Sequence, residues 1–476
     1  MPDDARPSLP VRNPRTGEVD AQLQVETSEI SARVERLRSG QIQWAASPIE
    51  ARAAALIRLA DALSDGRQAL ADALEADTGR RKIAAQEVDG VIASLRGWAG
   101  AAPHLISDPW TGGRSNPKLK HRPQFSPFPL VGVISPWNFP LTLSMIDTIP
   151  ALLAGCAVLI KPSEVTPRFA EPLRQIIEAA GLSDVLALVL GDGATGVALI
   201  QHVDAVCFTG SVATGRKVAL ACAERLIPAF LELGGKDPLI VLPGADLEAA
   251  TDAALRGSVL STGQACQSIE RIYVPAADYA AFLARLTEKA KAARLNWPEI
   301  TAGEIGPIIF DKQADILQRH IDDAVAKGAQ ILSGGRLHNH GGGLWLEPTV
   351  LAKVDHAMSV MTEETFGPIL PVMAYETLEE AIALANDSAY GLSAAVFGPD
   401  LDSAEAVARD IDAGAVSLND AALTALFYEA EKHAFKASGL GGSRMGPAGF
   451  HRFLRRKALI ANTGAPTPLA AFAEDA

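Results

Sequence analysis

Two residues of this chain have the chemistry of a nucleophile and of a general base. Cys266 lies in Gly263-Gln264-Ala265-Cys266, and Glu232 lies in Glu232-Leu233-Gly234-Gly235-Lys236. Small neighbours let a ligand approach both side chains. A thiolate can attack an aldehyde carbonyl, and a carboxylate can then activate water against the acyl group. Taken alone, Cys266 would be interpreted as a small buried residue and Glu232 as a salt-bridged structural carboxylate.

The composition is that of a large acidic enzyme. A length of 476 residues favours two or three domains, and the net charge of −13 argues against nucleic acid or an anionic membrane as partner. No run approaches the ~18 apolar residues of a membrane-spanning helix. Met1–Asp4 is acidic and lacks a hydrophobic signal core, so a cytoplasmic location is expected. The cysteines at 156, 207, 222 and 266 form neither a disulfide framework nor a zinc pattern, and no metal is expected.

The elements that must position these residues alternate between strand and helix. Residues 47–76 are expected to form one long helix, opened by a capping box from Ser47 to Glu50 with Pro48 at its first position. Buried strands are expected at 130–135, 156–161, 184–190 and 205–209, with helices at 167–180, 194–202 and 214–226. A second series comprises strands at 238–242, 271–274, 369–375, 392–397 and 415–418 and helices at 247–260, 277–294, 311–327, 378–386 and 402–412. The alternation predicts an α/β fold with parallel sheets covered on both faces.

Three further segments could bind a ligand at the strand ends. Thr209–Gly215 follows a strand and opens a helix, as a pyrophosphate site does, although a plain strand-to-helix turn has the same pattern. Lys161 and Glu164 end another strand and could bind ribose hydroxyls or form a solvated surface pair. Asn138 could stabilise an oxyanion, or it could belong to a structural turn that places Trp137 and Phe139 in the core.

Together these segments resemble the aldehyde dehydrogenase superfamily. The motifs occur in the family's order between about residues 11 and 460: Pro136-Trp137-Asn138-Phe139-Pro140, Lys161-Pro162-Ser163-Glu164, Phe208-Thr209-Gly210-Ser211, Glu232-Leu233-Gly234-Gly235-Lys236, Gly263-Gln264-Ala265-Cys266 and Glu363-Glu364-Thr365-Phe366-Gly367-Pro368. Six motifs in order over most of the chain make coincidence negligible.

The resemblance implies a role for each matching residue. Cys266 is the expected nucleophile, Glu232 the base that activates the deacylating water, and Asn138 the oxyanion donor together with the backbone N–H of Cys266. The expected cofactor-binding residues are Trp137, Lys161, Glu164, Gly210, Ser211, Gly215, Glu364 and Phe366. Hydride transfer to a nicotinamide would leave a thioester, which water hydrolyses to the acid.

The resemblance also implies the division of the chain. It comprises a dinucleotide-binding domain of residues 1–106 and 128–234, and a catalytic domain of 235–450. A small β arm for oligomerisation is expected from 107–127 and 451–476, with its C-terminal strand near 455–465. A homodimer or homotetramer is therefore expected. Both larger domains would be Rossmann-like α/β units.

The sequence departs from the family near its C-terminus. Lys436-Ala437-Ser438-Gly439 is kept, but Glu431-Lys432-His433-Ala434 stands where relatives commonly carry Pro-Phe-Gly-Gly. Lys432 could give the substrate pocket a charged rim suited to a functionalised or aromatic aldehyde, or the loop could be rebuilt with Lys432 pointing to solvent. Leu143, Ile146 and Gln267 are expected to line the rest of the pocket.

Three questions follow from the resemblance. Glu164 beside the adenosine ribose would repel a 2′-phosphate, which favours NAD and leaves NADP possible. A CoA-acylating semialdehyde dehydrogenase is one alternative, but such members generally lack the general-base glutamate that is present here as Glu232. A non-catalytic structural relative is another, and it should have lost Cys266, Glu232 or Asn138.

Overall fold

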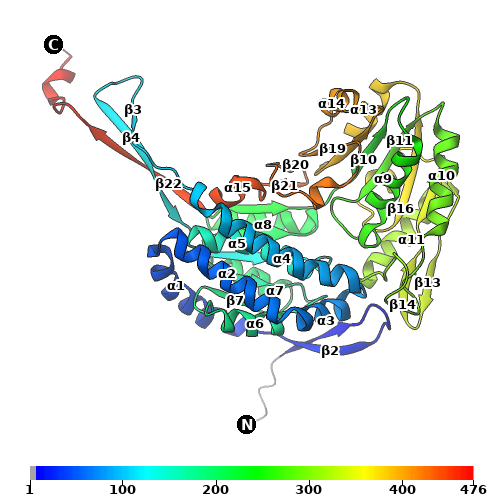
Figure 1. Ribbon diagram of the computed structural model, residues 1–476, viewed down its shortest axis with the longest axis horizontal. Coiled ribbons are helices and arrows are strands. Elements are labelled where there is room, and N and C mark those ends of the chain that lie inside the picture. The colour runs from blue at the N-terminus through cyan, green and yellow to red at the C-terminus, as the bar shows by residue number, and fades with distance from the viewer. Residues whose placement is uncertain (1–6, 475–476) are drawn as a thin grey trace, which may run out of the picture.

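The computed structural model describes residues 7–474. The acidic N-terminus and the outermost residues of the expected first domain and arm, 1–6 and 475–476, lie outside the described residues. Two sheets with their covering helices stand side by side, and a narrow β ribbon projects from the first (Figure 1). The expected α/β fold with parallel strands and a β arm is confirmed.

The first sheet has the strand order β21-β9-β8-β5-β6-β7, in which all neighbours are parallel except β21 and β9. Its strands are β5 (Leu130–Ile134), β6 (Ala157–Lys161), β7 (Leu186–Leu188), β8 (Ala205–Thr209), β9 (Ala229–Glu232) and β21 (Gly439–Leu440). The four strands expected here are confirmed, whereas β21 was not expected. Each chain segment that leaves a parallel strand at its carboxyl end emerges at one edge, where ligands of such folds bind.

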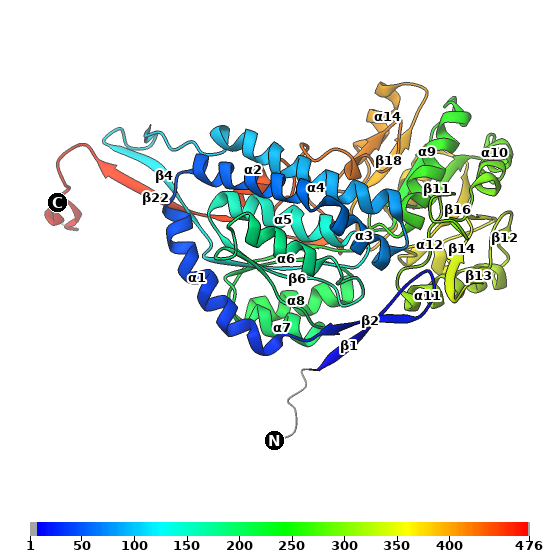
Figure 2. The ribbon, with the colours of Figure 1, turned by 60° about the horizontal axis from the view of Figure 1, so that its bottom comes forward.

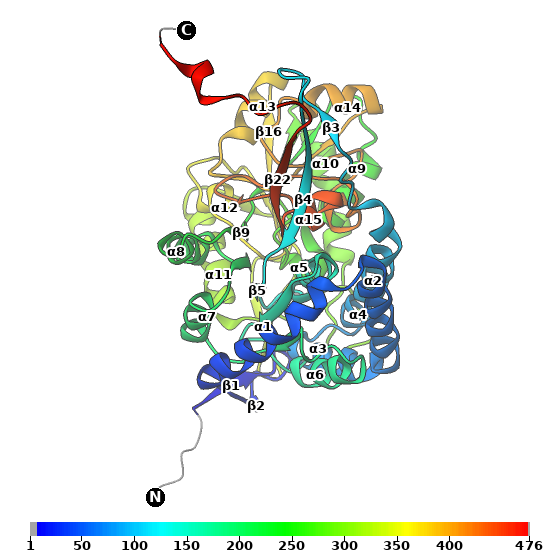
Figure 3. The same cartoon turned by 90° about the vertical axis from the view of Figure 1, so that its left-hand side faces the viewer.

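Helices cover both faces of this sheet. Figure 3 shows α7 and α8 on one side of β5 and α2, α4 and α5 on the other. The helices are α1 (Ile30–Ala46), α2 (Ile49–Asp65), α3 (Arg67–Thr78), α4 (Arg81–Ala101), α5 (Pro140–Ala154), α6 (Ala170–Ala179), α7 (Gly193–Ile200) and α8 (Val212–Glu224). The buried strands and these helices form one hydrophobic core.

The single helix expected over 47–76 is wrong. The chain forms α2 and α3 with a break at Gly66, whose backbone leaves helical geometry and whose N–H donates to the carbonyl of Ala62. A Cβ at Gly66 would lie 2.6 Å from Ile176 of α6, so the break lets α6 pack close. The capping box is wrong as well, because the Ser47 hydroxyl donates to the Trp44 carbonyl and no side chain caps α2.

The second sheet has the order β12-β15-β16-β11-β10-β18-β19, parallel except between β12 and β15. Its strands are β10 (Asp237–Val241), β11 (Ile269–Pro275), β12 (Gln330–Ile331), β15 (Thr349–Ala352), β16 (Ile369–Tyr375), β18 (Ala394–Phe397) and β19 (Val416–Leu418). Side chains alternate between its faces: Leu239 and Ile272 face one core, Ile240 and Tyr273 the other. The five strands expected here are confirmed, and β12 and β15 were missed.

The two faces of the second sheet carry different helices. One core joins the sheet to α9 (Leu247–Val259) and α10 (Tyr279–Ala292). The other joins it to α11 (Asp311–Ala326), α13 (Leu378–Asn386) and α14 (Leu401–Ala408) (Figure 2). All five helices were expected from their periodicity. The short helices α12 (Ser359–Thr362) and α15 (Gly446–His451) were not.

The arm is a three-stranded antiparallel ribbon. β4 (Leu119–Pro127) pairs along its whole length with β22 (Leu454–Asn462), and β3 (Thr111–Gly112) adds to β4. Figure 1 shows the ribbon extending away from the second sheet. The segments expected to form the arm therefore meet, with the C-terminal strand at 454–462 instead of 455–465. Two hairpins are formed by β1 (Ser8–Arg12) with β2 (Val19–Gln24) and by β13 (Leu337–His340) with β14 (Gly343–Leu346). The short strands β17 (Tyr390–Gly391) and β20 (Phe435–Lys436) form a further antiparallel pair.

Candidate active site

The fold brings the candidate base and nucleophile together between the two sheets. Glu232 is the last residue of β9, and Cys266 lies in the turn that precedes β11. The two segments touch at Gly235, where a Cβ would lie 2.4 Å from the Cys266 carbonyl oxygen. Of the four cysteines, Cys266 alone is not fully buried. Its partial exposure argues against the interpretation of Cys266 as a small core residue.

The backbone before Cys266 is held in an unusual conformation. Ser261, Thr262 and Gly263 have φ angles of 59°, 61° and 67°, all in the left-handed region. A Cβ at Gly263 would lie 2.4 Å from the carbonyl oxygen of Gly367, so this position requires glycine. Non-glycine residues in this region cost free energy and concentrate at functional sites. The strain here bends the chain sharply into the Cys266 turn.

Lys432 does not point to solvent, and that interpretation of the rebuilt loop is wrong. Its side chain is 3% exposed, and its Nζ lies 3.8 Å from Oε2 of Glu232. The backbone N–H of Lys432 donates to the Ser443 hydroxyl, which fixes the turn that aims the side chain inward. Within residues 7–474, Lys432 Nζ has no hydrogen-bond partner. A buried ammonium without a hydrogen bond therefore lies beside the candidate base.

Four charges act on the thiol. Desolvation raises the pKa of Cys266 to about 12, and the carboxylates of Glu232, Glu364 and Asp237 raise it as well. Lys432 is the cation that lowers it. The thiolate needed for attack on a carbonyl is therefore disfavoured by its surroundings and favoured by one neighbouring ammonium.

Asn138 is buried at the start of the chain that leads into α5. Its side-chain Nδ2 donates to the Gln264 backbone carbonyl at 3.0 Å, and the backbone carbonyl of Asn138 accepts from Arg80 Nη2. One amide hydrogen is thus spent on orienting the side chain beside the Cys266 turn, and a primary amide carries a second donor. Sequence reasoning missed Arg80, which reaches the site from the residue preceding α4; a lone arginine gives no signal of this.

The candidate nucleotide residues line the carboxyl edge of the first sheet. Lys161 ends β6 and is buried, with its Nζ 2.9 Å from the half-exposed carboxylate of Glu164. The pair is therefore not a solvated surface pair. Ser211 caps α8 by accepting from the N–H of Thr214, and its side chain is exposed. At Gly215 a Cβ would lie 2.4 Å from Leu233, so glycine lets α8 pack closely on the segment after β9.

Glu364 and Phe366 approach from the second sheet. Oε1 of Glu364 accepts from the Gly235 N–H at 3.1 Å, which joins it to the Glu232 motif. Burial, followed by the charge of Glu270, raises the pKa of Glu364 to about 8. The ring of Phe366 lies edge-on to Trp137, with centroids 5.3 Å apart. Trp137 and Phe366 thus join the two halves of the site.

A buried ion pair that sequence reasoning missed anchors this segment. Oε2 of Glu270 accepts from Lys236 Nζ at 2.8 Å and from the Thr365 N–H at 2.7 Å. Oε1 accepts from the Phe366 N–H at 2.8 Å. Because Lys236 belongs to the Glu232 motif, one side-chain pair ties that motif to the segment carrying Glu364 and Phe366.

The expected pocket residues fall on two elements. Leu143 and Ile146 are half-buried and lie three residues apart on α5, so they share one helix face. Gln267 follows Cys266 and accepts a hydrogen bond from the Thr424 hydroxyl. Thr424 was not anticipated as a neighbour of the site.

Ser438, in the Lys436–Gly439 segment, supports the end of β9. Its hydroxyl donates to the Gly234 carbonyl at 2.7 Å, and its carbonyl accepts from the Leu233 N–H at 2.8 Å. This segment also forms β21, whose Gly439 pairs with Glu232. The C-terminal part of the chain therefore returns to hold the candidate base in place.

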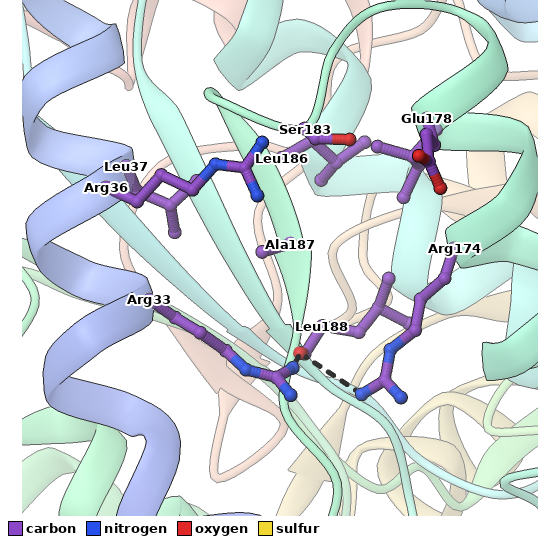
Figure 4. Close-up of a pocket in the computed structure, with 10 residues that line it drawn as sticks. Arg33, Arg36, Leu37, Arg174, Glu178, Ser183, Leu186, Ala187 and Leu188 are labelled. Atoms are coloured by element: carbon purple, nitrogen blue, oxygen red, sulfur yellow. Dashed lines mark hydrogen bonds between the residues drawn. The ribbon is translucent and has the colours of Figure 1, made fainter.

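A separate cavity of about 340 Å³ lies between α1, α6 and β7, away from these residues. Figure 4 shows Arg33 and Arg174 directed at the carbonyl of Leu188, and the same arginines pair with Glu26. Its cations are thus occupied by protein groups.

Among residues 7–474, no cluster of three or more His, Cys, Asp or Glu is arranged to hold a metal ion. In the same range, no helix is both long and apolar enough to cross a membrane.

The geometry agrees with comparisons to known proteins. The model of the aldehyde dehydrogenase family matches residues 1–459. A Mycolicibacterium smegmatis protein named "Putative succinate-semialdehyde dehydrogenase", with NADP(+) as its stated cofactor, is 38% identical over 92% of this chain and 86% of its own. The solved "Putative Aldehyde Dehydrogenase PutA" from Anabaena variabilis is 52% identical, with a TM-score of 0.95 over 97% of this chain and 99% of its own.

A third relative was solved with a nucleotide. Betaine aldehyde dehydrogenase from Staphylococcus aureus in complex with NAD+ is 31% identical, with a TM-score of 0.90 over 98% of this chain and 94% of its own. The chain belongs to the aldehyde dehydrogenase family. It is an oxidoreductase that oxidises an aldehyde to the carboxylic acid with NAD(P).

Proposed function

We propose that Cys266 is the nucleophile and Glu232 the general base of this oxidation, with Asn138 as oxyanion donor. The observation that supports this most is the meeting of the β9 end with the Cys266 turn, where the charge of Glu232 acts on the thiol. The Cys266 thiolate adds to the carbonyl carbon, and the amide of Asn138 donates to the resulting oxyanion. NAD(P), when bound, would accept the hydride from that carbon, whose carbonyl then re-forms as a thioester to Cys266. Glu232 then takes a proton from water, which attacks the thioester and releases the acid and the thiolate.

The residues at the sheet edges fit a dinucleotide. The exposed start of α8, with Ser211 at its cap, offers backbone N–H groups to a pyrophosphate. Lys161 and Glu164 would bind the adenosine ribose, Gly210 and Gly215 would let the phosphates approach, and Glu364 and Phe366 would hold the nicotinamide ribose and ring. The proposed division assigns residues 1–106 and 128–234 to nucleotide binding and 235–450 to catalysis, with Asn138 and Glu232 contributed to the chemistry from the first part and Glu364 and Phe366 contributed to the nucleotide from the second.

Rapid-mixing kinetics with NAD+ and propanal test these roles. Glu232→Gln is expected to give a burst of about one NADH per active site and then slow turnover, reduced by about 10²–10⁴ because a general base contributes that much. Cys266→Ala should give no burst. A native enzyme whose turnover depends on added CoA would overturn the hydrolytic mechanism, and full activity of Cys266→Ala would overturn the nucleophile.

NAD is the proposed preferred cofactor. Glu164 keeps a half-exposed carboxylate where the ribose would lie, and its partner Lys161 is already paired with it. A 2′-phosphate would meet this carboxylate and be repelled. The name of the Mycolicibacterium smegmatis relative contains NADP(+), so a preference for NADP is the competing outcome. Measuring kcat/KM with both nucleotides for the native chain decides the matter, and a higher value for NADP would overturn the proposal.

The arm is proposed to join copies of the chain into a homodimer or homotetramer. β22 is paired on one edge with β4 and is largely exposed, with Ile460 70% exposed. A ribbon of this kind, standing away from the body, is a ready site for pairing with another strand. Light scattering on the native chain and on one truncated after residue 453 tests this, and an unchanged mass would contradict it.

The four free thiols favour the proposed cytoplasmic location.

A further inference from the structure

We propose that Lys432 is the positioning residue of the catalytic pair: its buried ammonium, 3.8 Å from Oε2 of Glu232, holds that carboxylate in place and brings a positive charge to the site. This rests on the proposed roles of Glu232 and Cys266. Lys432 is the residue of the Glu431–Ala434 segment whose charge lies beside Glu232. The rebuilt Glu431–Ala434 segment therefore adds an electrostatic function to the site.

The geometry of Lys432 supports this role over a packing role. A buried ammonium without a hydrogen bond is unfavourable unless a charge compensates it, and Glu232 at 3.8 Å is that charge. A purely structural lysine would be expected to have its three donors satisfied. Lys432 Nζ instead lies 3.8 Å from Oε2 of Glu232 without a hydrogen bond, and its charge also lowers the pKa of Cys266.

The backbone of this segment is built to hold that position. The N–H of Lys432 donates to Ser443, and the carboxylate of Glu431 accepts from the Ala448 N–H at the start of α15. On the other side, Gly414 leaves room for the His433 carbonyl, which a Cβ there would approach to 1.6 Å. Contacts on both sides of Lys432 thus fix where its side chain begins.

Other charges around the pair are engaged elsewhere or have the wrong sign. Arg444 Nη2 donates to Asp147 at 2.7 Å and to Thr209 at 2.8 Å. Asp237 accepts from Ser393, and Glu364 accepts from Gly235. The groups that face the thiol and base electrostatically are Lys432, Arg444, Asp237, Glu364 and Tyr428. Of these, Lys432 is the cation without a hydrogen bond.

The thiolate also experiences Glu232 and Lys432 as opposing charges. Glu232 raises the pKa of Cys266, whereas Lys432 lowers it. Deprotonation releases the thiol proton to solvent and leaves a second anion near Glu232. Removing Lys432 alone therefore leaves two anions facing each other, and removing both Lys432 and Glu232 relieves that repulsion.

Alkylation of the full-length apo-enzyme by iodoacetamide, followed from pH 6 to 9, tests the proposal. Cys156, Cys207 and Cys222 are buried, and Cys266→Ala gives the background rate. Lys432→Met is expected to slow alkylation of Cys266 about tenfold or more at pH 8, because a neighbouring opposite charge typically shifts a pKa by about 1–3 units. Lys432→Met/Glu232→Gln should recover most of the rate, and Lys432→Arg should stay close to the native enzyme.

Lys436→Met is the matched control. It removes a lysine four residues along the same segment, whose ammonium contacts the Asn386 carbonyl and Asp412. Its alkylation rate should equal that of the native chain. Lys432→Met removes the counter-charge of Glu232, so its melting temperature is expected to fall, and Lys432→Met/Glu232→Gln should recover part of that loss.

Two results would overturn the proposal. One is a change in alkylation rate of less than about twofold in Lys432→Met, below the tenfold expected for one pKa unit. The other is a selective rise in KM for succinate semialdehyde over propanal at an unchanged alkylation rate, which would assign Lys432 to substrate recognition. The burst of Glu232→Gln tests the nucleophile and base separately, so a failure of this proposal leaves that result standing.

Discussion

Replacing Glu270 by Gln should weaken both the stability of the chain and its hold on the dinucleotide. Glu270 is 2% exposed and receives three hydrogen bonds, from Lys236 Nζ and from the N–H groups of Thr365 and Phe366. Gln keeps the shape but removes the charge, and its NH₂ group cannot accept. Lys236, 1% exposed, would then be a buried ammonium without its counter-ion.

The size of the effect follows from this burial. Breaking a buried ion pair by removing one partner costs about 3–5 kcal/mol. A domain of about 200 residues loses roughly 2–4 °C of melting temperature per kcal/mol, so Glu270→Gln should lower it by roughly 6–20 °C. Glu304→Gln is the matched control, because Glu304 also accepts from a basic side chain and a backbone N–H, those of Arg294, but is 55% exposed. Exposed pairs contribute little, so its melting temperature should stay near the native value.

The effect on the nucleotide comes from the segment that Glu270 anchors. Loss of one charge-assisted hydrogen bond costs about 1.5–3 kcal/mol, which is roughly a 10- to 150-fold loss if it is expressed entirely in binding. The dissociation constant of NAD+ can be followed by tryptophan fluorescence, since Trp137 contacts Phe366. Lys236→Met should be destabilised yet bind NAD+ more tightly than Glu270→Gln, because the Thr365 and Phe366 N–H groups keep their acceptor.

Two results would refute this reasoning. If Glu270→Gln melts no lower than Glu304→Gln, the buried pair does not stabilise the fold. If NAD+ affinity in Glu270→Gln stays within about twofold of native, well short of the tenfold expected from one lost bond, the segment does not depend on its anchor.

Two further predictions concern the same region. Gly414→Ala should displace the Lys432 segment, since its Cβ would lie 1.6 Å from the His433 carbonyl oxygen, and iodoacetamide alkylation of Cys266 should slow as in Lys432→Met; a native rate would contradict this. Glu364 has its pKa raised to about 8 by burial and by Glu270, so its proton stabilises the fold at low pH and that contribution is lost as pH rises from about 4.3 through 8. Glu364→Gln should therefore melt higher relative to the native chain at pH 9 than at pH 5 in calorimetry, and an equal difference at both pH values would contradict this.

Residues at the ends of parallel strands were predictable because their position depends on local pattern. Lys161 and Thr209 each follow a short apolar run, and the carboxyl ends of such strands meet at one edge. Glu232 was expected within its motif, but the neighbour of β9 in the sheet was not recognised. The pairing of β9 with β21 joins residues more than 200 positions apart, and no local pattern reports that partner.

The errors share one physical cause, which is that tertiary packing overrides local preference. A strongly helical pattern is broken at Gly66, because Ile176 occupies the space that a Cβ at position 66 would fill. Lys432 is buried although lysine is rarely so, because Glu232 offers a compensating charge. The anchoring role of Glu270 was missed because its three donors come from distant segments.

The electrostatics of the site make Cys266 dependent on a single cation. Lys236 and Arg444 are also buried nearby, but each is hydrogen-bonded to a carboxylate of its own, Glu270 in one case and an aspartate of α5 in the other. Their positive charges are thus largely neutralised by these carboxylates and have little effect on the thiol. Lys432 has no hydrogen bond and lies 3.8 Å from the carboxylate of the candidate base, so movement of that carboxylate alters the charge that Cys266 experiences. Nucleophile and base should therefore respond together to the position of one side chain, and a substitution at 432 should change both half-reactions where a substitution at 236 or 444 changes mainly the fold.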